Sequence, residues 1–212
     1  IYQLQSTRKA KFNEGGVNRL KELGTLLSLT SLLSIGIVGC SSERKEMPVA
    51  IDGVIDLSGW DFKKDGAAQL KGEWRFVWKE FLEPMPSDVF RARYPGVMTV
   101  PLSNWARHSN PYRPDSLLSG QGYATYVLEV RLPRVRNQSN FSLTTQHQGT
   151  AASYVITDPR SAATLATLYQ GVPGIKERET VPVYVDPFGS FQLGSSENIQ
   201  IWMRISNFHH HG

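Results

Sequence analysis

Carboxylate side chains are the first groups in this sequence whose types and spacing could do chemistry. Asp52, Asp56, Asp61 and Asp65 follow one another closely along the chain. A pair of such carboxylates can supply the acid and base steps of glycoside hydrolysis. These four lie in a segment rich in turn residues, where an aspartate usually accepts hydrogen bonds from the neighbouring backbone. We therefore expect them to stabilise turns rather than to catalyse a reaction.

Histidines at positions 209–211 are a second group of potential ligands. Imidazole binds Zn, Ni and Cu, but consecutive residues of an extended chain point to opposite sides, so three adjacent histidines rarely converge on one ion. The sequence also lacks a Gly-x-Ser-x-Gly elbow, a phosphate-binding glycine loop and a His-Glu-x-x-His motif. We expect no metal site, no cofactor and no enzymatic activity in this chain.

One long loop holds better candidates for binding a small molecule. Sugars stack their C–H faces on aromatic rings and pair their hydroxyls with polar groups nearby. Trp105 ends a predicted strand and opens the loop 106–122, and loops at the ends of rigid sheets often carry binding sites. For Trp105, packing in the core is the alternative. The candidate ligand-binding residues are Trp105, Arg107, His108, Tyr112 and Tyr123.

The single cysteine, Cys40, follows a stretch that could direct its modification. Residues 23–39 carry no charge, Arg19 and Lys21 precede them, and Ile37-Val38-Gly39 leads directly into the cysteine. A basic region, an apolar region and a small-residue exit are typical of a bacterial export signal. The ending resembles the lipobox at which lipoproteins are cleaved and lipidated on cysteine. The alternatives are an uncleaved signal anchor, because the apolar stretch is near the lower length limit for a span, or an internal helix.

Charge is concentrated in the same N-terminal part of the chain. The whole chain has 23 Lys and Arg against 19 Asp and Glu, a formal charge of +4. Residues 1–40 hold five basic and two acidic residues, so +3 of that charge lies there and +1 in the rest. No basic run or stripe remains outside this segment to bind a phosphate backbone. Nucleic-acid binding is therefore excluded as a leading function.

These patterns divide the chain into three parts. We expect residues 1–40 to form a leader with a hydrophobic signal helix, residues 41–50 a polar linker, and residues 51–212 a β-sandwich domain. The chain begins with Ile rather than Met, and Val17 could correspond to a GUG start codon. Residues 1–16 would then be untranslated, which is one hypothesis for the N-terminus.

Short alternating segments dominate the part after residue 50. Trp74, Phe76 and Trp78 alternate on one strand, so we expect them in the core. Strands without crossover helices imply an all-β fold, an antiparallel sandwich or jelly roll whose sheets each have one wet face. One short helix is expected near 78–82, ended by Pro84 and Pro86. The predicted strands are 54–57, 73–78, 97–100, 124–132, 140–145, 153–157, 164–169, 181–185 and 198–205.

Several sequence blocks occur in an order that carries a family resemblance. The blocks are IDLSGWDF at 55–62, LKGEWRFVW at 70–78, VPLSNW at 100–105, GYATY at 122–126 and SNFHH at 206–210. Together they resemble the N-terminal extracytoplasmic domain of bacterial seven-transmembrane receptors with diverse intracellular signalling modules. The resemblance covers roughly residues 50–212. It implies a galactose-binding-like jelly roll and accounts for His209 and His210 as part of the closing segment.

The resemblance implies a sensor domain in the cell envelope, facing the periplasm or the cell exterior. Such a domain would bind a small carbohydrate-like ligand and act on a transmembrane signalling partner or on a further region of the receptor. The adenylate or guanylate cyclase, histidine kinase or diguanylate cyclase output would lie outside this chain. A looser resemblance to the sugar-binding jelly roll of β-galactosidase-type glycosidases suggests a lipid-anchored accessory domain instead. A structural envelope lipoprotein that binds only proteins is the third alternative.

Overall fold

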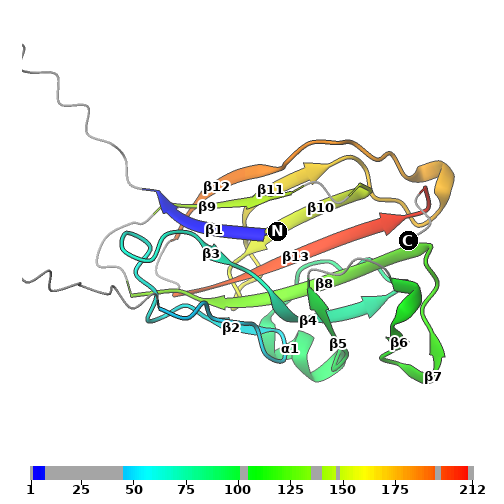
Figure 1. Ribbon diagram of the computed structural model, residues 1–212, viewed down its shortest axis with the longest axis horizontal. Coiled ribbons are helices and arrows are strands. Elements are labelled where there is room, and N and C mark those ends of the chain that lie inside the picture. The colour runs from blue at the N-terminus through cyan, green and yellow to red at the C-terminus, as the bar shows by residue number, and fades with distance from the viewer. Residues whose placement is uncertain are drawn as a thin grey trace, which may run out of the picture. The chain divides into compact units, whose positions relative to one another are not determined.

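Two β-sheets face each other across one hydrophobic core (Figure 1). The computed structural model describes residues 2–7, 45–100, 105–134, 140–146, 149–193 and 197–209. The small sheet has the order β12-β9-β1-β3, with β1 (Tyr2–Thr7), β3 (Ala68–Gln69), β9 (Asn140–Thr145) and β12 (Phe188–Gln192), all paired antiparallel. We call the two sheets together the two-sheet domain.

The large sheet has the order β11-β10-β13-β8-β4-β5, and β2 pairs with β8 in parallel. Its strands are β2 (Val54–Asp56), β4 (Gly72–Trp78), β5 (Val97–Val100), β8 (Gly122–Arg131), β10 (Ala151–Thr157), β11 (Thr164–Gln170) and β13 (Asn198–Asn207). A separate hairpin joins β6 (Ser109–Asn110) to β7 (Arg113–Leu117). The helices are α1 (Ser87–Arg93), η1 (Trp105–Arg107) and η2 (Glu177–Glu179).

The core contains the apolar faces that the alternating patterns predicted. Trp74 and Phe76 of β4 are fully buried there, and Trp78 packs against the same cluster while partly exposed. The inward residues of β8 and β13, and Leu132 just after β8, are buried in it as well: Tyr126, Leu128, Val130 and Leu132 with Ile199, Ile201, Met203 and Ile205. The expectation of antiparallel sheets around an apolar core is therefore confirmed.

The sequence predicted that the outer face of the large sheet would contact solvent, but in the structure this face is covered. The helix α1 and the segment before it cover Val127 and Trp202, which pack with Phe90 in a second apolar cluster. Polar outward residues are buried too. Thr125 is fully buried and its hydroxyl donates to Glu80 O at 2.8 Å. An antiparallel sheet can expose one face, but here a helix uses that face as its packing surface.

The prediction of a helix near residues 78–82 is wrong, because the helix α1 begins further along the chain, at Ser87. Trp78 is still the last residue of β4, and Lys79 adopts a positive φ of 56°, which ends the strand in a turn. The helix begins only after Pro86, whose φ of −53° suits a position just before the first turn. Pro84 and Pro86 therefore do not end a helix, and Pro86 precedes one.

The leader expected over residues 1–40 needs correction at its start. Residues 2–7 form β1, which pairs with β9 over six residues and with β3 over two. Tyr2 and Leu4 are 4% and 0% exposed and belong to the core. This segment is thus part of the two-sheet domain rather than of a separate leader. The apolar stretch 23–39 lies outside the described residues.

The prediction of strands succeeded where apolar and polar residues alternate along the segment, and it failed for most of the other strands. Eight of the nine predicted segments match strands of the large or small sheet to within two residues at each end. The segment 181–185 is not a strand, since only Val181 makes an isolated bridge with Val172. The strands β1, β3, β6, β7 and β12 were not predicted. In the described part of the chain, no helix combines the length and apolar character that a membrane crossing needs.

We expect Phe90→Ala to lower the free energy of unfolding by about 3 kcal/mol, because it removes the ring that fills the outer cluster. Phe90 is 1% exposed, and its ring lies edge-on to Trp202 with centroids 5.0 Å apart. Val89→Ala in the same helix is the matched control, since Val89 is 51% exposed, and should change stability by less than about 0.5 kcal/mol. Urea denaturation measures both. Equal effects would contradict the packing of α1 on the sheet.

We expect Tyr154→Phe to protect the domain from alkaline unfolding. Burial raises the pKa of Tyr154 to about 12, so the neutral phenol is favoured in the folded state. Its contribution to stability is complete below pH 10, the ordinary pKa, and is lost as the pH rises toward 12. Unfolding by urea at pH 8 and at pH 11.5 should show the variant losing less stability than the wild type. Tyr169→Phe is the control, because Tyr169 is exposed; a parallel loss in all three proteins would refute the assignment.

Candidate ligand-binding pocket

A pocket of about 540 Å³ lies between the end of β4 and the β6–β7 hairpin. Figure 1 shows this hairpin beside the C-terminal end of β4 and the start of β8. The volume is in the range of sites for small molecules. Its lining residues come from β4, the hairpin and the loop after it: Trp78, Lys79, Asn110, Tyr112, Arg113, Ser116, Leu117 and Ser119.

Trp78 is held in the wall of the pocket by aromatic contacts. Its indole stacks near Phe76, with ring centroids 6.0 Å apart, and meets Trp105 edge-on at 4.8 Å. Gly122 lies against the same indole, where a Cβ atom would come within 2.7 Å of Cη2 of Trp78. The φ of Gly122 is +154°, which also favours glycine. Glycine at this position therefore lets the ring lie across the start of β8.

The hairpin is fixed to the large sheet by Tyr112. The Asn110 side-chain oxygen accepts a hydrogen bond from the Tyr112 N–H at 2.9 Å, which closes the turn around Pro111. The Tyr112 hydroxyl then donates to the backbone oxygen of Phe76 at 2.6 Å. Partial burial raises the pKa of Tyr112 above its ordinary value. The hydroxyl end is thus anchored to β4, while the residue as a whole remains 42% exposed.

The second strand of the hairpin returns to the core at Leu118. Its N–H donates to His108 O at 2.9 Å, and its side chain is 3% exposed. Beyond it, the Ser119 hydroxyl accepts from the Gln121 N–H at 3.2 Å, and Gln121 donates to Phe208 O at 3.0 Å. The loop that closes the pocket is therefore tied to the end of β13.

The lining carries two positive charges and no carboxylate. Lys79 and Arg113 both line the pocket and are exposed, and neither makes an ion pair within the part of the chain that the structure describes. Asn110, Ser116 and Ser119 add neutral hydrogen-bonding groups. Together with two aromatic rings, this set can stack on a flat ligand face, pair with hydroxyls and attract an anion.

Tyr112 is the residue from the predicted ligand-binding set that lines this pocket. Trp105 is 7% exposed and its Nε1–H donates to the Tyr126 hydroxyl at 2.8 Å, so it belongs to the core, where its ring contacts that of Trp78. Arg107 is exposed and His108 half-buried, but neither is part of the lining. Tyr123 packs edge-on against Phe81, with ring centroids 5.0 Å apart, and is not part of the lining either.

Sequence reasoning missed Trp78 and Lys79 as pocket residues. The alternation along β4 predicted that Trp78 lies in the core. Its indole does pack against the core, but it is only partly buried and also lines the pocket. A usable signal was its position as the last residue of the strand, where a large ring can be covered on one side only. Lys79, Ser116 and Ser119 had no such signal. The predicted lipidation site, Cys40, lies outside the described residues.

Three of the four aspartates lie in or next to turns, as expected, and Asp56 is the last residue of β2, directly before one. The hydroxyl of Ser58 lowers the pKa of Asp56, and so does the Ser58 N–H, which donates to the same carboxylate at 2.8 Å. Asp61 accepts from Lys63 N–H at 2.9 Å and donates its own N–H to Asp65 at 3.0 Å. Each of these carboxylates thus accepts from a nearby backbone N–H, and Asp56 also pairs with Arg131 of β8 at 3.7 Å.

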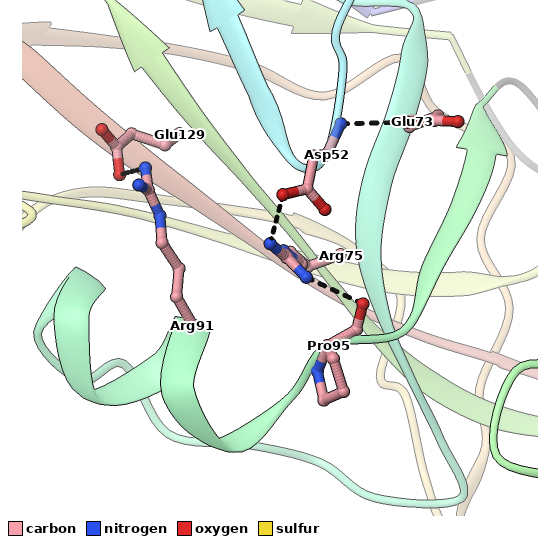
Figure 2. A network of polar contacts seen from close by, with 6 residues as sticks. All are labelled: Asp52, Glu73, Arg75, Arg91, Pro95 and Glu129. Carbon is pink, nitrogen blue, oxygen red and sulfur yellow. Dashed lines mark hydrogen bonds and ion pairs between the residues drawn. The ribbon is translucent and has the colours of Figure 1, made fainter.

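Asp52 belongs to a larger network, shown in Figure 2. Arg75 donates to the Asp52 carboxylate and to Pro95 O, each at 2.7 Å, while Glu73 accepts from the Asp52 N–H at 3.0 Å. Nearby, Glu129 accepts from Arg91 of α1 and also from Ser87. These contacts tie the turn before β2 and both ends of α1 to the large sheet. Because its charges are paired with one another, the network is structural rather than a binding site.

The histidine run adds no metal centre to the described residues. His209 lies with Nε2 3.3 Å from Thr180 O, and positions 210–211 are outside the described part. No three His, Cys, Asp or Glu side chains in the described ranges gather closely enough to hold an ion. Comparison with protein-family models finds no match to this chain, and comparison with curated proteins finds none either.

We expect Gly122→Ala to destabilise the domain by about 2 kcal/mol, because the new Cβ pushes Trp78 out of its place. Gly66→Ala is the matched control: Gly66 also has a positive φ, +79°, but a Cβ there meets nothing within 4 Å. The control should be destabilised only by the backbone strain of a residue with a Cβ at positive φ, by about 1 kcal/mol. Urea denaturation gives the stabilities, and near-ultraviolet circular dichroism reports the tryptophan environment. An unchanged tryptophan spectrum in Gly122→Ala would contradict the packing described.

Proposed function

We propose that this chain is an extracytoplasmic ligand-binding domain with a galactose-binding-like jelly-roll fold, which takes a small carbohydrate-like molecule into the pocket beside Trp78. The observation that carries the proposal is the lining itself. Two aromatic residues, Trp78 and Tyr112, stand among neutral hydrogen-bonding groups and two cations. Carbohydrates need this combination, because their ring faces are apolar and their edges carry hydroxyls.

The charges in the lining favour an acidic sugar over a neutral one. Lys79 and Arg113 have no carboxylate beside them in the lining, so a ligand carboxylate, sulfate or phosphate would supply the missing negative charge. A guanidinium can hold such a group through two parallel hydrogen bonds. A neutral sugar would use only the aromatic and hydroxyl groups of the pocket.

The pocket's construction suits a sensor. Its walls come from β4 and from the separate β6–β7 hairpin, which Tyr112 and Leu118 attach to the rest of the domain. A ligand that contacts both walls binds most tightly to one position of the hairpin, and so shifts the equilibrium toward it. In the proposed setting, a lipid at Cys40 or an uncleaved signal anchor holds the domain at the membrane, and a transmembrane partner reads the shift.

Two other functions keep specific support. A lipid-anchored accessory domain of a glycosidase would use the same pocket with no signalling step. A structural envelope lipoprotein would instead bind proteins, and exposed apolar side chains around the edge strands β11 and β12 favour it: Tyr169, Val172, Val181, Tyr184, Val185 and Phe188. Gene context separates the first two, since a neighbouring frame with seven apolar spans and a signalling enzyme supports the sensor, and a TIM-barrel hydrolase supports the accessory domain.

We expect the full chain, purified in detergent, to bind acidic saccharides on a glycan array that carries neutral, uronic-acid, sulfated and phosphorylated members. Arg113→Ala should weaken binding to an acidic hit about fivefold, the loss of about 1 kcal/mol for one exposed ion pair. Arg160→Ala is the matched control, because Arg160 is an exposed cation that is not part of the lining. Titration followed by tryptophan fluorescence measures the affinities.

The array has three informative outcomes. A blank array with a folded protein, verified by circular dichroism, would discredit both sugar-binding functions and leave the protein-binding lipoprotein. Binding of neutral saccharides alone, unaffected by Arg113→Ala, would remove the preference for an acidic ligand. If Arg113→Ala and Arg160→Ala weakened saccharide binding equally, the binding site would not be this pocket.

A further inference from the structure

Lys79 holds a backbone conformation that a side chain disfavours. Its φ is 56°, in the left-handed region, where a Cβ atom crowds the following carbonyl oxygen. In the described part of the chain most residues with positive φ are glycines, and Asp52 and Ala162 are the other exceptions. Strain of this kind persists only where the surrounding structure fixes it, and it often marks a functional position.

Hydrogen bonds on both sides of Lys79 impose this conformation. Its N–H donates to Tyr123 O at 2.9 Å, so the ladder between β4 and β8 extends one residue beyond the end of β4. The chain then crosses the outer face of β8, where the Thr125 hydroxyl donates to Glu80 O at 2.8 Å and accepts from the Leu82 N–H at 3.1 Å. The backbone of Lys79 is therefore set by the strand before it and by the crossing segment after it.

The side chain of Lys79 makes no contact in the fold that offsets this strain. It is exposed, and it forms neither a hydrogen bond nor an ion pair among the described residues. Asp52 differs, because its carboxylate accepts from Arg75. Ala162 lies in a turn that its N–H closes on Asp158 O. Glycine would adopt the conformation of Lys79 without strain, so the use of this side chain lies outside the fold.

The pocket beside Trp78 gives the Lys79 ammonium a place to act. Lys79 lines it from the end of β4, and Arg113 lines it from the hairpin, while the described residues of the lining include no carboxylate. The backbone of Lys79 continues the β4–β8 ladder, whereas β6 and β7 pair only with each other. Lys79 is thus the more firmly placed of the two cations, and a group placed before binding loses less freedom when the ligand arrives.

We propose that Lys79 is the specificity-determining residue of this pocket: its ammonium binds the acidic group of the ligand, and the left-handed backbone aims it there. Arg113 contacts the same group from the hairpin. The ligand class is a saccharide with a carboxylate, sulfate or phosphate, and a small oxyanion alone binds at the same place. This inference rests on the proposed ligand-binding pocket and deepens it, because it assigns the choice between acidic and neutral ligands to one side chain.

The test uses the full chain in detergent and three probes at constant ionic strength: inorganic sulfate, glucuronate, and glucose, which has a hydroxymethyl group in place of the carboxylate. Tryptophan fluorescence follows each titration. Lys79→Gln and Lys79→Gly should each weaken the binding of sulfate and glucuronate about fivefold, the loss of one exposed ion pair, and leave glucose binding unchanged. Lys79→Arg keeps the charge and should bind all three probes as the wild type does.

Thermal unfolding without any probe gives a second readout, in the opposite direction. Lys79→Gly should raise the melting temperature by about 2 °C, because glycine adopts a positive φ without strain, whereas Lys79→Gln should leave it unchanged. Ala162→Gly is the matched control, since Ala162 has a φ of 58° and is not part of the lining. It should gain the same stability and bind the three probes as the wild type does.

The outcomes separate this inference from the proposed function. Glucuronate binding that Lys79→Gln leaves intact, or an equal loss of glucose binding, would overturn the role of Lys79 while the sugar pocket stands. A stability gain in Ala162→Gly but not in Lys79→Gly would also overturn it. Sulfate binding that depends on Lys79, without binding of either sugar, would support the anion site and remove the carbohydrate assignment. A wild type that binds none of the three probes would overturn both.

Discussion

The antiparallel pairing of β8 with β13 runs over ten residues of each strand and has both faces buried, and most of the structure follows from this constraint. The inner face supplies the core with the small sheet, so it is apolar throughout. The outer face needs a cover, which α1 provides, and its polar members need partners. Arg204, for example, donates twice to Leu82 O at 2.8 and 2.9 Å. At one end of the pair, Gly122 and Asn207 hold the loop that closes the pocket.

Alternation along single strands was enough to predict the large sheet, because each of its long strands has a continuous apolar face toward the core. The same reasoning failed where a strand forms only because it pairs with segments far away in the sequence. Residues 2–7 offer only two inward side chains, and their role depends on the β9 and β3 edges. Residues 181–185 are rich in β-branched residues, yet Val181 finds one bridge and Val183 and Val185 remain exposed. Propensity alone does not create a strand without a neighbouring edge.

The pocket shows why the site was harder to predict than the sheet. The sequence pointed to the loop after Trp105, and Tyr112 of that loop lines the pocket. It could not show that Trp105 turns inward to Tyr126, because this depends on a hydrogen bond across 21 positions of sequence. Nor could it place Trp78 opposite the hairpin. That contact needs Gly122 at the start of β8 to leave room for the indole, a relation between strands rather than within one.

The apolar face of β4 connects β1 with the pocket. Trp74 contacts Tyr2 of β1, Phe76 follows on the same face, and Trp78 lines the pocket. Ring contacts then extend from Trp78 to Trp105. Close-packed interiors respond to a volume change by shifting neighbours rather than by absorbing it. A side chain smaller than that of Tyr2 at this position would therefore loosen the support of Trp74 first. Since β4 also pairs with β8 and β5, its backbone resists passing that change on to the pocket.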